Sequence, residues 1–188
     1  MRLKHDNDGR GTGSIVPGHL LKETWHSHQV FITNNHVVST TYKNAMHPKE
    51  VEIVFEAHDS KEDASRPYRV KEVLWESPIE YLDTTYVLLD QPVPKVPGLR
   101  MADRVPGKEG IDRIYIAGYP RGAGLRLSIR DNRLIAANDT RIRYRSPTEE
   151  GSSGSPVFNE ALELIAIHHE GHENRMVSLK DSPRLVWC

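Results

Sequence analysis

Short apolar or alternating runs, each bounded by glycine, proline or polar turn residues, recur along this chain of 188 residues. They show no sustained 3.6-residue period, and such runs are typical of β-strands rather than of amphipathic helices. The segments expected to form strands are 13–16, 28–33, 50–55, 68–75, 84–90, 113–120, 125–130, 133–138, 140–145, 155–158 and 162–169. Many short strands separated by such turns predict an all-β barrel or sandwich.

The segment "QPVPKVPG", residues 91–98, carries three prolines and divides the expected strands into two comparable groups. Proline cannot donate to a strand ladder, so this segment is expected to be an extended linker. The length of the chain suits a single domain. We therefore expect one domain over 1–188, with a first strand group at about 11–91, a linker at about 92–110 and a second group at about 111–180.

Composition excludes several functional classes. The net charge of −1 and the pI near 6.8 favour neither a nucleic acid nor an anionic membrane as partner. No run is long enough to span a membrane, and residues 1–13 lack the apolar core of a signal peptide. A lone cysteine, Cys188, cannot form an intrachain disulfide, which favours a reducing compartment. The sequence thus predicts a cytoplasmic location.

The segment "GSSGSPVF", residues 151–158, places serines and glycines directly before an apolar run. One interpretation is a flexible linker. The other is a tight turn that presents Ser153 as a nucleophile, because small residues allow backbone N–H groups to converge on one spot. Gly151 would then leave room for the oxyanion that develops during acyl transfer. A strand that follows at once favours the turn.

Two further segments supply an acid and a base. His36 follows an apolar run in "FITNNHVV", and histidine is the usual general base. The alternative is a polar loop histidine, and the chain has ten histidines. Asp83 enters the apolar strand "TTYVLLD", where a buried carboxylate would need a hydrogen-bonded partner. The alternative is a carboxylate at the start of the strand that faces water.

Taken together, these segments resemble the trypsin-like, chymotrypsin-fold serine peptidases. The resemblance is closest to bacterial members, namely the glutamyl endopeptidases and the intracellular trypsin-like peptidases. It rests on the order histidine, aspartate, serine and on further matches. These are "GTGSIV" at 11–16, "TNNHVV" at 33–38, "LDTTYVLLD" at 82–90, "IAGYPRG" at 116–122, "GSSGSPVFN" at 151–159 and "IAIHHEG" at 165–171.

The resemblance implies two six-stranded antiparallel β-barrels with the active site in the cleft between them. It implies that Ser153 is the nucleophile, that His36 is the general base and that Asp83 orients His36. The backbone N–H groups of Gly151 and Ser153 would form the oxyanion hole. The implied activity is that of a serine endopeptidase that needs no cofactor and acts on a protein or peptide.

Some positions depart from the digestive members of the family. Ser152 stands where those enzymes carry an aspartate that pairs with a newly cut N-terminus, so activation by N-terminal cleavage is not expected. Their disulfides are absent as well. The tail at 172–188 is short and unlike the C-terminal helix of the family. We therefore expect the second barrel to be closed differently or by a partner.

The resemblance also implies a specificity pocket. Thr148 and His168 lie at the spacings from Ser153 at which glutamyl endopeptidases carry a hydroxyl and a histidine. Both side chains can donate to a carboxylate, whereas Pro147 occupies the position of the trypsin pocket acid. This predicts a preference for acidic P1 residues. In the alternative, His168 only packs and forms hydrogen bonds beneath the pocket.

Adjacent histidines on a strand face opposite sides, so His168 and His169 are not expected to share a metal ion, and His26 and His28 lack a third ligand nearby. No metal is therefore expected. Intracellular members of the family are often modules of regulatory or antiviral defence systems, which implies a controlled bacterial protease with a regulatory partner protein. The alternative function is a catalytically silent or latent module that binds a partner peptide in the cleft.

Overall fold

The computed structural model describes residues 2–3, 10–55, 67–103, 113–122, 124–130, 132–138, 140–146 and 149–169. Throughout these ranges the fold is all-β, as expected, and every expected segment contains an observed strand. A short strand at 2–3 was not expected. The helical segments here are single 3-10 turns, and none is long and apolar enough to cross a membrane. These turns are η1 (Gly18–Leu20), η2 (Glu23–Trp25) and η3 (Pro120–Gly122).

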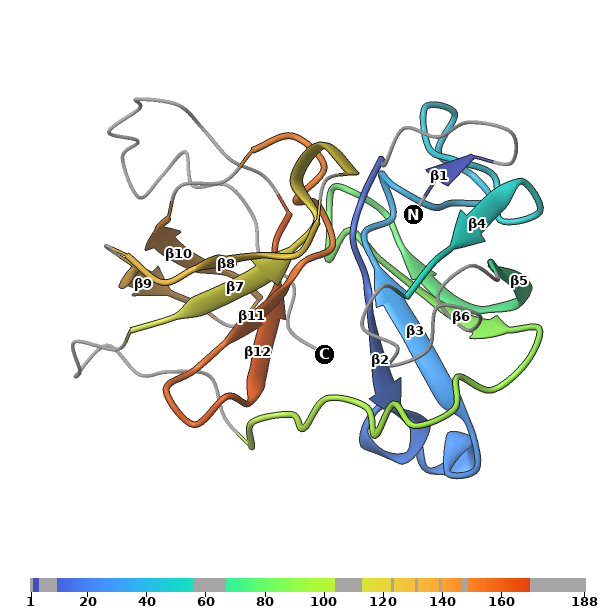
Figure 1. Ribbon diagram of the computed structural model, residues 1–188, viewed down its shortest axis with the longest axis horizontal. Helices are drawn as coiled ribbons and strands as arrows, with labels where there is room; N and C mark the ends of the chain where they lie inside the picture. Colours follow the sequence, from blue (N-terminus) through green and yellow to red (C-terminus); the bar gives the residue numbers. More distant parts are fainter. Residues whose placement is uncertain are drawn as a thin grey trace.

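The first strand group forms a six-stranded antiparallel sheet in the order β1-β4-β5-β6-β3-β2, on the right of Figure 1. The alternation in β4 has its expected result, because Val51 and Ile53 are buried while Glu52 is not. The strands are β1 (Arg2–Leu3), β2 (Ser14–Pro17), β3 (Gln29–Thr33), β4 (Val51–Ile53), β5 (Tyr68–Ser77) and β6 (Thr84–Leu89).

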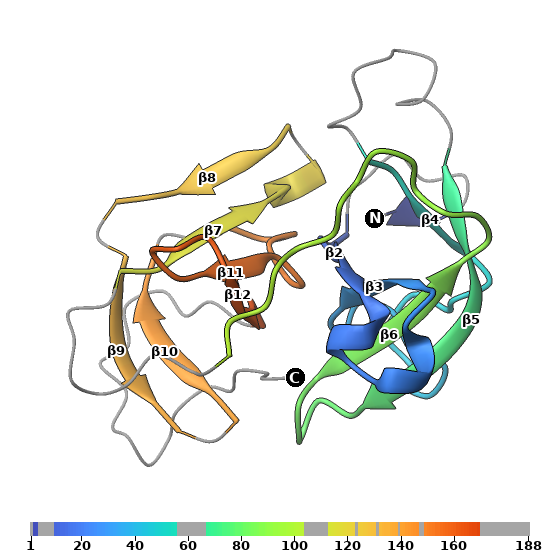
Figure 2. The ribbon, with the colours of Figure 1, turned by 90° about the horizontal axis from the view of Figure 1, so that it is seen from below.

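In the described residues, the second group forms a four-stranded sheet, β12-β11-β7-β8, and a two-stranded sheet, β10-β9. A bridge between Arg113 and Arg133 joins the chain just before β7 to β9. Figure 2 shows the β9–β10 hairpin set apart from β8. The strands are β7 (Tyr115–Gly118), β8 (Arg126–Ser128), β9 (Arg133–Ala137), β10 (Ile142–Arg145), β11 (Pro156–Phe158) and β12 (Leu164–Ile167).

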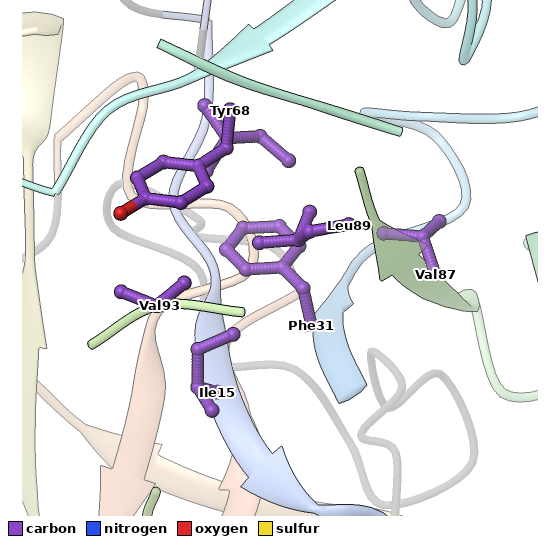
Figure 3. Close-up of a cluster of buried hydrophobic side chains, with 7 residues drawn as sticks. Ile15, Phe31, Tyr68, Val87, Leu89 and Val93 are labelled. Carbon is purple, nitrogen blue, oxygen red and sulfur yellow. The ribbon is translucent and has the colours of Figure 1, made fainter. Parts of the chain in front are cut away.

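Each strand group has its own apolar core, and a further cluster spans the two. Figure 3 shows the first-group core, where Phe31 packs among residues of β2, β5 and β6. A core of isoleucines and valines from β7, β10, β11 and β12 lies in the second group. The spanning cluster packs Val16, Val30, Ile32 and Tyr86 of the first group against Leu164 and Ile167 of β12. This cluster fixes how the two halves meet, and the candidate site lies along that junction.

The proline-rich linker is fastened to both halves. Gln29 donates to the carbonyls of Val93 and Val96 and accepts from the Val93 N–H, and the Val93 side chain enters the first core. Further on, Leu99 N–H donates to the Ile15 carbonyl, and Leu164 N–H donates to the Arg100 carbonyl. The segment is not fully extended, because it turns at Pro94 and Lys95 and Lys95 has a φ of 59°. Its hydrogen bonds help to hold the junction together.

Candidate active site

The ends of three strands bring His36, Asp83 and Ser153 to the junction between the halves. His36 lies on a turn after β3, Asp83 directly precedes β6, and Ser153 lies on the turn before β11. β3 and β6 are antiparallel neighbours, so the end of one lies beside the start of the other. The chain thus brings together residues separated by more than a hundred positions.

His36 and Asp83 form a two-point contact. The Nδ1 atom of His36 lies 2.6 Å from Asp83 Oδ2, and the His36 backbone N–H donates to Asp83 Oδ1 at 2.8 Å. The His36 side chain is 24% exposed, whereas that of Asp83 is fully buried. The alternatives of a free loop histidine and a water-facing aspartate are therefore wrong. One edge of the imidazole is held, and the Nε2 edge remains to act as a base.

Asp83 is held in place by its backbone as well as by its carboxylate. Its φ of 47° lies in the left-handed region, which is uncommon for a residue with a side chain. The Asn34 side chain and the Asn35 backbone N–H both donate to the Asp83 carbonyl, and the Asp83 N–H donates to the Pro78 carbonyl. These bonds give a structural role to Asn34 and Asn35, which precede the histidine in "TNN". They hold Asp83 in place from the turn that carries His36.

The pKa of the Asp83 carboxyl lies below its ordinary value. Burial alone would raise this pKa, but hydrogen bonds from His169 and His36, together with the attraction of their positive charge, outweigh burial. The carboxylate is therefore ionised at neutral pH. An ionised, buried carboxylate beside an imidazole favours the tautomer with hydrogen on Nδ1 and stabilises the imidazolium.

The nucleophile turn depends on two glycines. Gly151 and Gly154 have φ values of 85° and 84°, and a Cβ on Gly154 would lie 2.0 Å from the Thr12 carbonyl oxygen. Ser152 and Ser155 are buried, while Ser153 is partly exposed. Of the three serines, Ser153 is thus the one that a substrate can reach. The interpretation of this segment as a flexible linker is wrong.

Thr12, in "GTGSIV", ties the first half to this turn. Its backbone N–H donates to the Ser153 carbonyl at 2.8 Å, and its hydroxyl donates to the Gly151 carbonyl at 3.1 Å. The same hydroxyl accepts from the Tyr119 N–H. These bonds hold the turn that carries Ser153 against the segment before β2. In the described part of the chain, neither Gly151 N–H nor Ser153 N–H donates to a protein group, which suits the expected oxyanion hole.

Comparison with known proteins identifies the family. Residues 11–167 match the family model described as "Trypsin-like peptidase domain". The chain belongs to the trypsin-like peptidases. An uncharacterized protein of Sinorhizobium fredii (strain NBRC 101917 / NGR234), y4fB, is 27% identical over 195 residues, which cover 94% of this chain and 27% of the relative. The chain thus spans about a quarter of that relative's length.

Two solved structures share the fold of this trypsin-like peptidase. One is a crystal structure of the Rv3671c protease in an inactive form, with a TM-score of 0.54 and 20% identity over 94% of this chain and 77% of that one. The other is a serine-to-alanine mutant of Rv3671c from M. tuberculosis H37Rv, also in an inactive form. It has a TM-score of 0.52 and 21% identity over 94% of this chain and 75% of that one. The expected closeness to glutamyl endopeptidases stays a prediction.

His169 is the residue that the sequence interpretation missed. Its Nδ1 forms a short hydrogen bond with Asp83 Oδ2, the same oxygen that His36 contacts. Its carbonyl oxygen lies 3.5 Å from Ser153 Oγ. The alternation of side chains along a strand was used for His168 and His169 only to argue against a shared ion, which stays a prediction. The same alternation sends one of two adjacent histidines toward the site.

Ligand-type atoms of His36, Asp83 and His169 lie within 4.8 Å of one another. Each imidazole Nδ1 is engaged with the carboxylate through a hydrogen bond, which accounts for this close approach. We therefore assign the cluster to hydrogen bonding. The expectation of a site without metal stays a prediction.

His168 lies on the other side of the chain from His169 and is buried. Its Nδ1 lies 2.6 Å from the Tyr144 hydroxyl. Burial first, and then the positive charge of His169 and His36, lowers the pKa of His168 to about 4, while burial raises that of Tyr144. Tyr144 is therefore the donor and neutral His168 the acceptor, which leaves the His168 hydrogen on Nε2. Thr148, the other expected pocket residue, lies outside the described residues, as do Pro147 and the tail at 172–188.

A solvent-open groove of about 810 Å³ lies between the halves, with His36 on one side and Gly151 on the other. Its wall holds Arg10, Lys43, His47 and Arg121 together with the acids Glu50 and Glu150. The groove is polar and shared by both halves. In this trypsin-like peptidase, a molecule in the groove would contact His36 and Gly151, which lies two residues before Ser153.

Proposed function

We propose that this trypsin-like peptidase is a serine endopeptidase with Ser153 as nucleophile. The observation that supports this most strongly is the pairing of His36 with the buried, ionised Asp83 beside an accessible serine on a glycine-dependent turn. A structural ion pair would not need that serine. Nor would it need the backbone N–H groups of Gly151 and Ser153, which donate to no protein group in the described part of the chain.

The proposed reaction proceeds in two transfers. Ser153 Oγ attacks the substrate carbonyl carbon while His36 Nε2 takes the hydroxyl proton. Asp83 then balances the charge of the imidazolium, and the N–H groups of Gly151 and Ser153 donate to the oxyanion. His36 returns the proton to the leaving amine, which breaks the peptide bond and leaves an acyl group on Ser153. Water, deprotonated by His36, hydrolyses this ester, and no cofactor takes part.

A fluorophosphonate probe tests this proposal directly, because it reacts with an activated serine and needs no known substrate. The wild-type protein should be labelled on Ser153, and Ser153→Ala should not. Ser152→Ala, which alters the buried neighbour, serves as the matched control and should keep its labelling. Equal labelling of the wild type and Ser153→Ala would refute the proposal. Cleavage-site mapping on a proteome digest, with Ser153→Ala as reference, would then define the substrates.

A latent form of the enzyme is the second candidate, and one contact favours it. Ser153 Oγ is directed at the His169 carbonyl, and among the residues that the structure describes no hydrogen bond joins it to His36. Such bonds often form only when substrate is bound. Labelling that appears only after a peptide or partner protein is added would support latency. A silent peptide-binding module would stay unlabelled under all conditions.

For specificity we propose acidic P1 residues. Support comes from the resemblance to glutamyl endopeptidases and from the tautomer of His168. With Nδ1 accepting from Tyr144, the neutral imidazole keeps an Nε2–H that can donate to a carboxylate. Recognition would then depend on a hydrogen bond rather than on a positive charge. A P1 peptide library decides this: preferred cleavage after Arg, Phe or Ala would contradict it.

We also propose a restricted, regulatory role in the bacterial cytoplasm, of which antiviral defence is one form. The resemblance to intracellular family members and the lone Cys188 support it. A place within a larger chain would suit such a role, and this chain aligns with 27% of the length of y4fB. Cleavage-site mapping separates a regulatory protease, with one or a few targets, from a digestive one.

A further inference from the structure

Two imidazoles converge on a single carboxylate oxygen. Both His36 Nδ1 and His169 Nδ1 contact Asp83 Oδ2, and the two rings lie edge to face, with centroids 5.6 Å apart and an interplanar angle of 74°. The His169 side chain is only 6% exposed and that of Asp83 is fully buried. His169 is the second residue after β12, so the second half of the molecule reaches across the junction to Asp83 of the first.

Counting protons defines what each ring contributes. An ionised carboxylate can only accept hydrogen bonds, so each Nδ1 must carry a hydrogen. The carboxylate bears one negative charge, which both donors share. While His169 is neutral, that charge is available to the imidazolium that forms on His36. Once His169 is protonated, its own positive charge already balances Asp83.

We infer that His169 is a positioning residue that switches the site off in acid: neutral, it holds Asp83 in place for His36, and protonated, it competes with His36 for the charge of Asp83. This inference rests on the proposed function, since it concerns regulation of the same site. It gives a reason for a histidine at a position where a residue that does not titrate could donate an equally good hydrogen bond.

Two neighbours of His169 keep a fixed charge state near neutral pH. Asp83 before β6 and His36 after β3 face His169, and the adjacent His168 contacts Tyr144 on β10. Asp83 stays ionised and His168 stays neutral from about pH 5 upward, because the pKa of each lies lower. Histidine ordinarily changes charge between about pH 5 and 8.

Three variants separate the roles of His169. His169→Asn keeps an N–H donor near the position of Nδ1 but cannot titrate. His169→Gln keeps the amide but moves it one bond farther from Asp83. His28→Asn is the matched control, because His28 is exposed and lies before β3, at the other end of that strand from His36. At neutral pH, fluorophosphonate labelling should match the wild type for His28→Asn and should be about ten- to hundredfold slower for His169→Gln, with His169→Asn between them because it keeps the donor.

The pH profile of the labelling rate carries the test. In the wild type and in His28→Asn, the logarithm of the rate should fall in acid with a slope that exceeds one and approaches two, because two protons inactivate the site. In His169→Asn the slope should be one, and this variant should keep more of its activity in acid. A slope of one in the wild type that is unchanged in His169→Asn would overturn the inference.

Proton NMR at neutral pH tests the geometry without any activity. Strongly hydrogen-bonded imidazole N–H protons resonate far downfield, so the wild type should show two such signals and His169→Asn one. A single signal in the wild type would contradict the shared carboxylate. If the wild type is never labelled but shows both signals, the proposed function fails while the His169–Asp83 bond stands. The two failures are therefore distinguishable.

Discussion

The two halves of the molecule build their parts of the site by different means. In the first half, the structure of the site depends mainly on side chains. The Asn34 amide, the His36 imidazole and backbone N–H, and Asp83 form a hydrogen-bonded cluster. In the second half, the turn at 151–154 is shaped by its backbone, with two glycines at positive φ and close contacts around them. The first part depends on which groups donate and accept hydrogen bonds, and the second depends on the small volume available around its glycines.

This difference predicts how each half fails. The hydrogen-bonded cluster of the first half should be destabilised most by a substitution that keeps the side-chain volume but alters its donors and acceptors, because an unpaired buried polar group is costly. A tight glycine turn is damaged most by added atoms, whatever their polarity. An isosteric polar change in the first half and an added methyl group in the second are therefore the sharpest ways to test the comparison.

The largest effect is expected for Asp83→Asn. The asparagine keeps the volume but replaces one accepting oxygen by a donor, so that the side chain cannot accept from the His36 backbone N–H through one atom and from the imidazoles of His36 and His169 through the other. With the wrong tautomer at His36, fluorophosphonate labelling should slow by about 10⁴-fold. Asp103→Asn, an exposed acid, is the matched control and should match the wild type. Labelling of Asp83→Asn within tenfold of wild type would show that Asp83 does not orient the base.

The second-half counterpart is Gly154→Ala. The added Cβ would lie 2.0 Å from the Thr12 carbonyl oxygen and 2.6 Å from Thr33 Oγ1, at a residue with a φ of 84°. Overpacking and backbone strain together should lower the free energy of unfolding by about 2–5 kcal/mol. Chemical denaturation measures this. Gly124→Ala, where the added Cβ would meet nothing within 4 Å, should change it by less than about 0.5 kcal/mol. Similar losses in both variants would mean that the turn is not tightly packed.

The same contrast explains how far the sequence could predict the site. His36, Asp83 and Ser153 lie in local patterns that carry their own signal: a histidine after a strand, an acid before an apolar strand and a serine between glycines. Strand periodicity likewise placed each strand except the one at 2–3. Such features depend on neighbouring residues, and neighbouring residues are what a sequence displays.

His169 and Thr12 could not be found in this way, because their roles exist only between the halves. His169 is defined by Asp83, 86 residues earlier, and Thr12 by Gly151, 139 residues later. The division of the second strand group into two sheets was missed as well, since the sequence displays strands but not which of them pair. Local patterns predicted the parts of the site, and only the packing of the halves shows how these parts are joined.

An intermediate effect is expected from His168, which is buried in the second half. Its pKa of about 4 lies below the ordinary 6.5, so between these pH values the unfolded chain binds a proton that the folded protein does not. The free energy of unfolding should therefore fall as pH falls through this window, with His168 contributing about 3 kcal/mol. Asp83, whose pKa is also lowered, loses its contribution only below 3.8.

Denaturation of the wild type and His168→Gln between pH 7 and 4 measures this contribution. The variant should be less stable at pH 7 but should lose less stability on acidification. His26→Gln, which alters an exposed histidine, is the control and should follow the wild type. Parallel curves for the wild type and His168→Gln would show that His168 titrates normally in the folded protein.

The smallest effect tests the bridge between the halves. Thr12→Val keeps the shape of the side chain and the backbone bond to Ser153 but removes the hydroxyl between Gly151 and Tyr119. We expect a loss of about 1–3 kcal/mol in the free energy of unfolding, as for other buried hydrogen bonds, while Thr140→Val at an exposed site should be nearly neutral. The relation between stability and labelling is decisive here. If Thr12 only joins the halves, the labelling rate of the folded variant should be unchanged. Slower labelling under conditions where the variant is fully folded would mean that the hydroxyl also positions the Gly151 and Ser153 N–H groups. We expect the slower labelling, because the carbonyl that the hydroxyl holds belongs to the same turn as both donors.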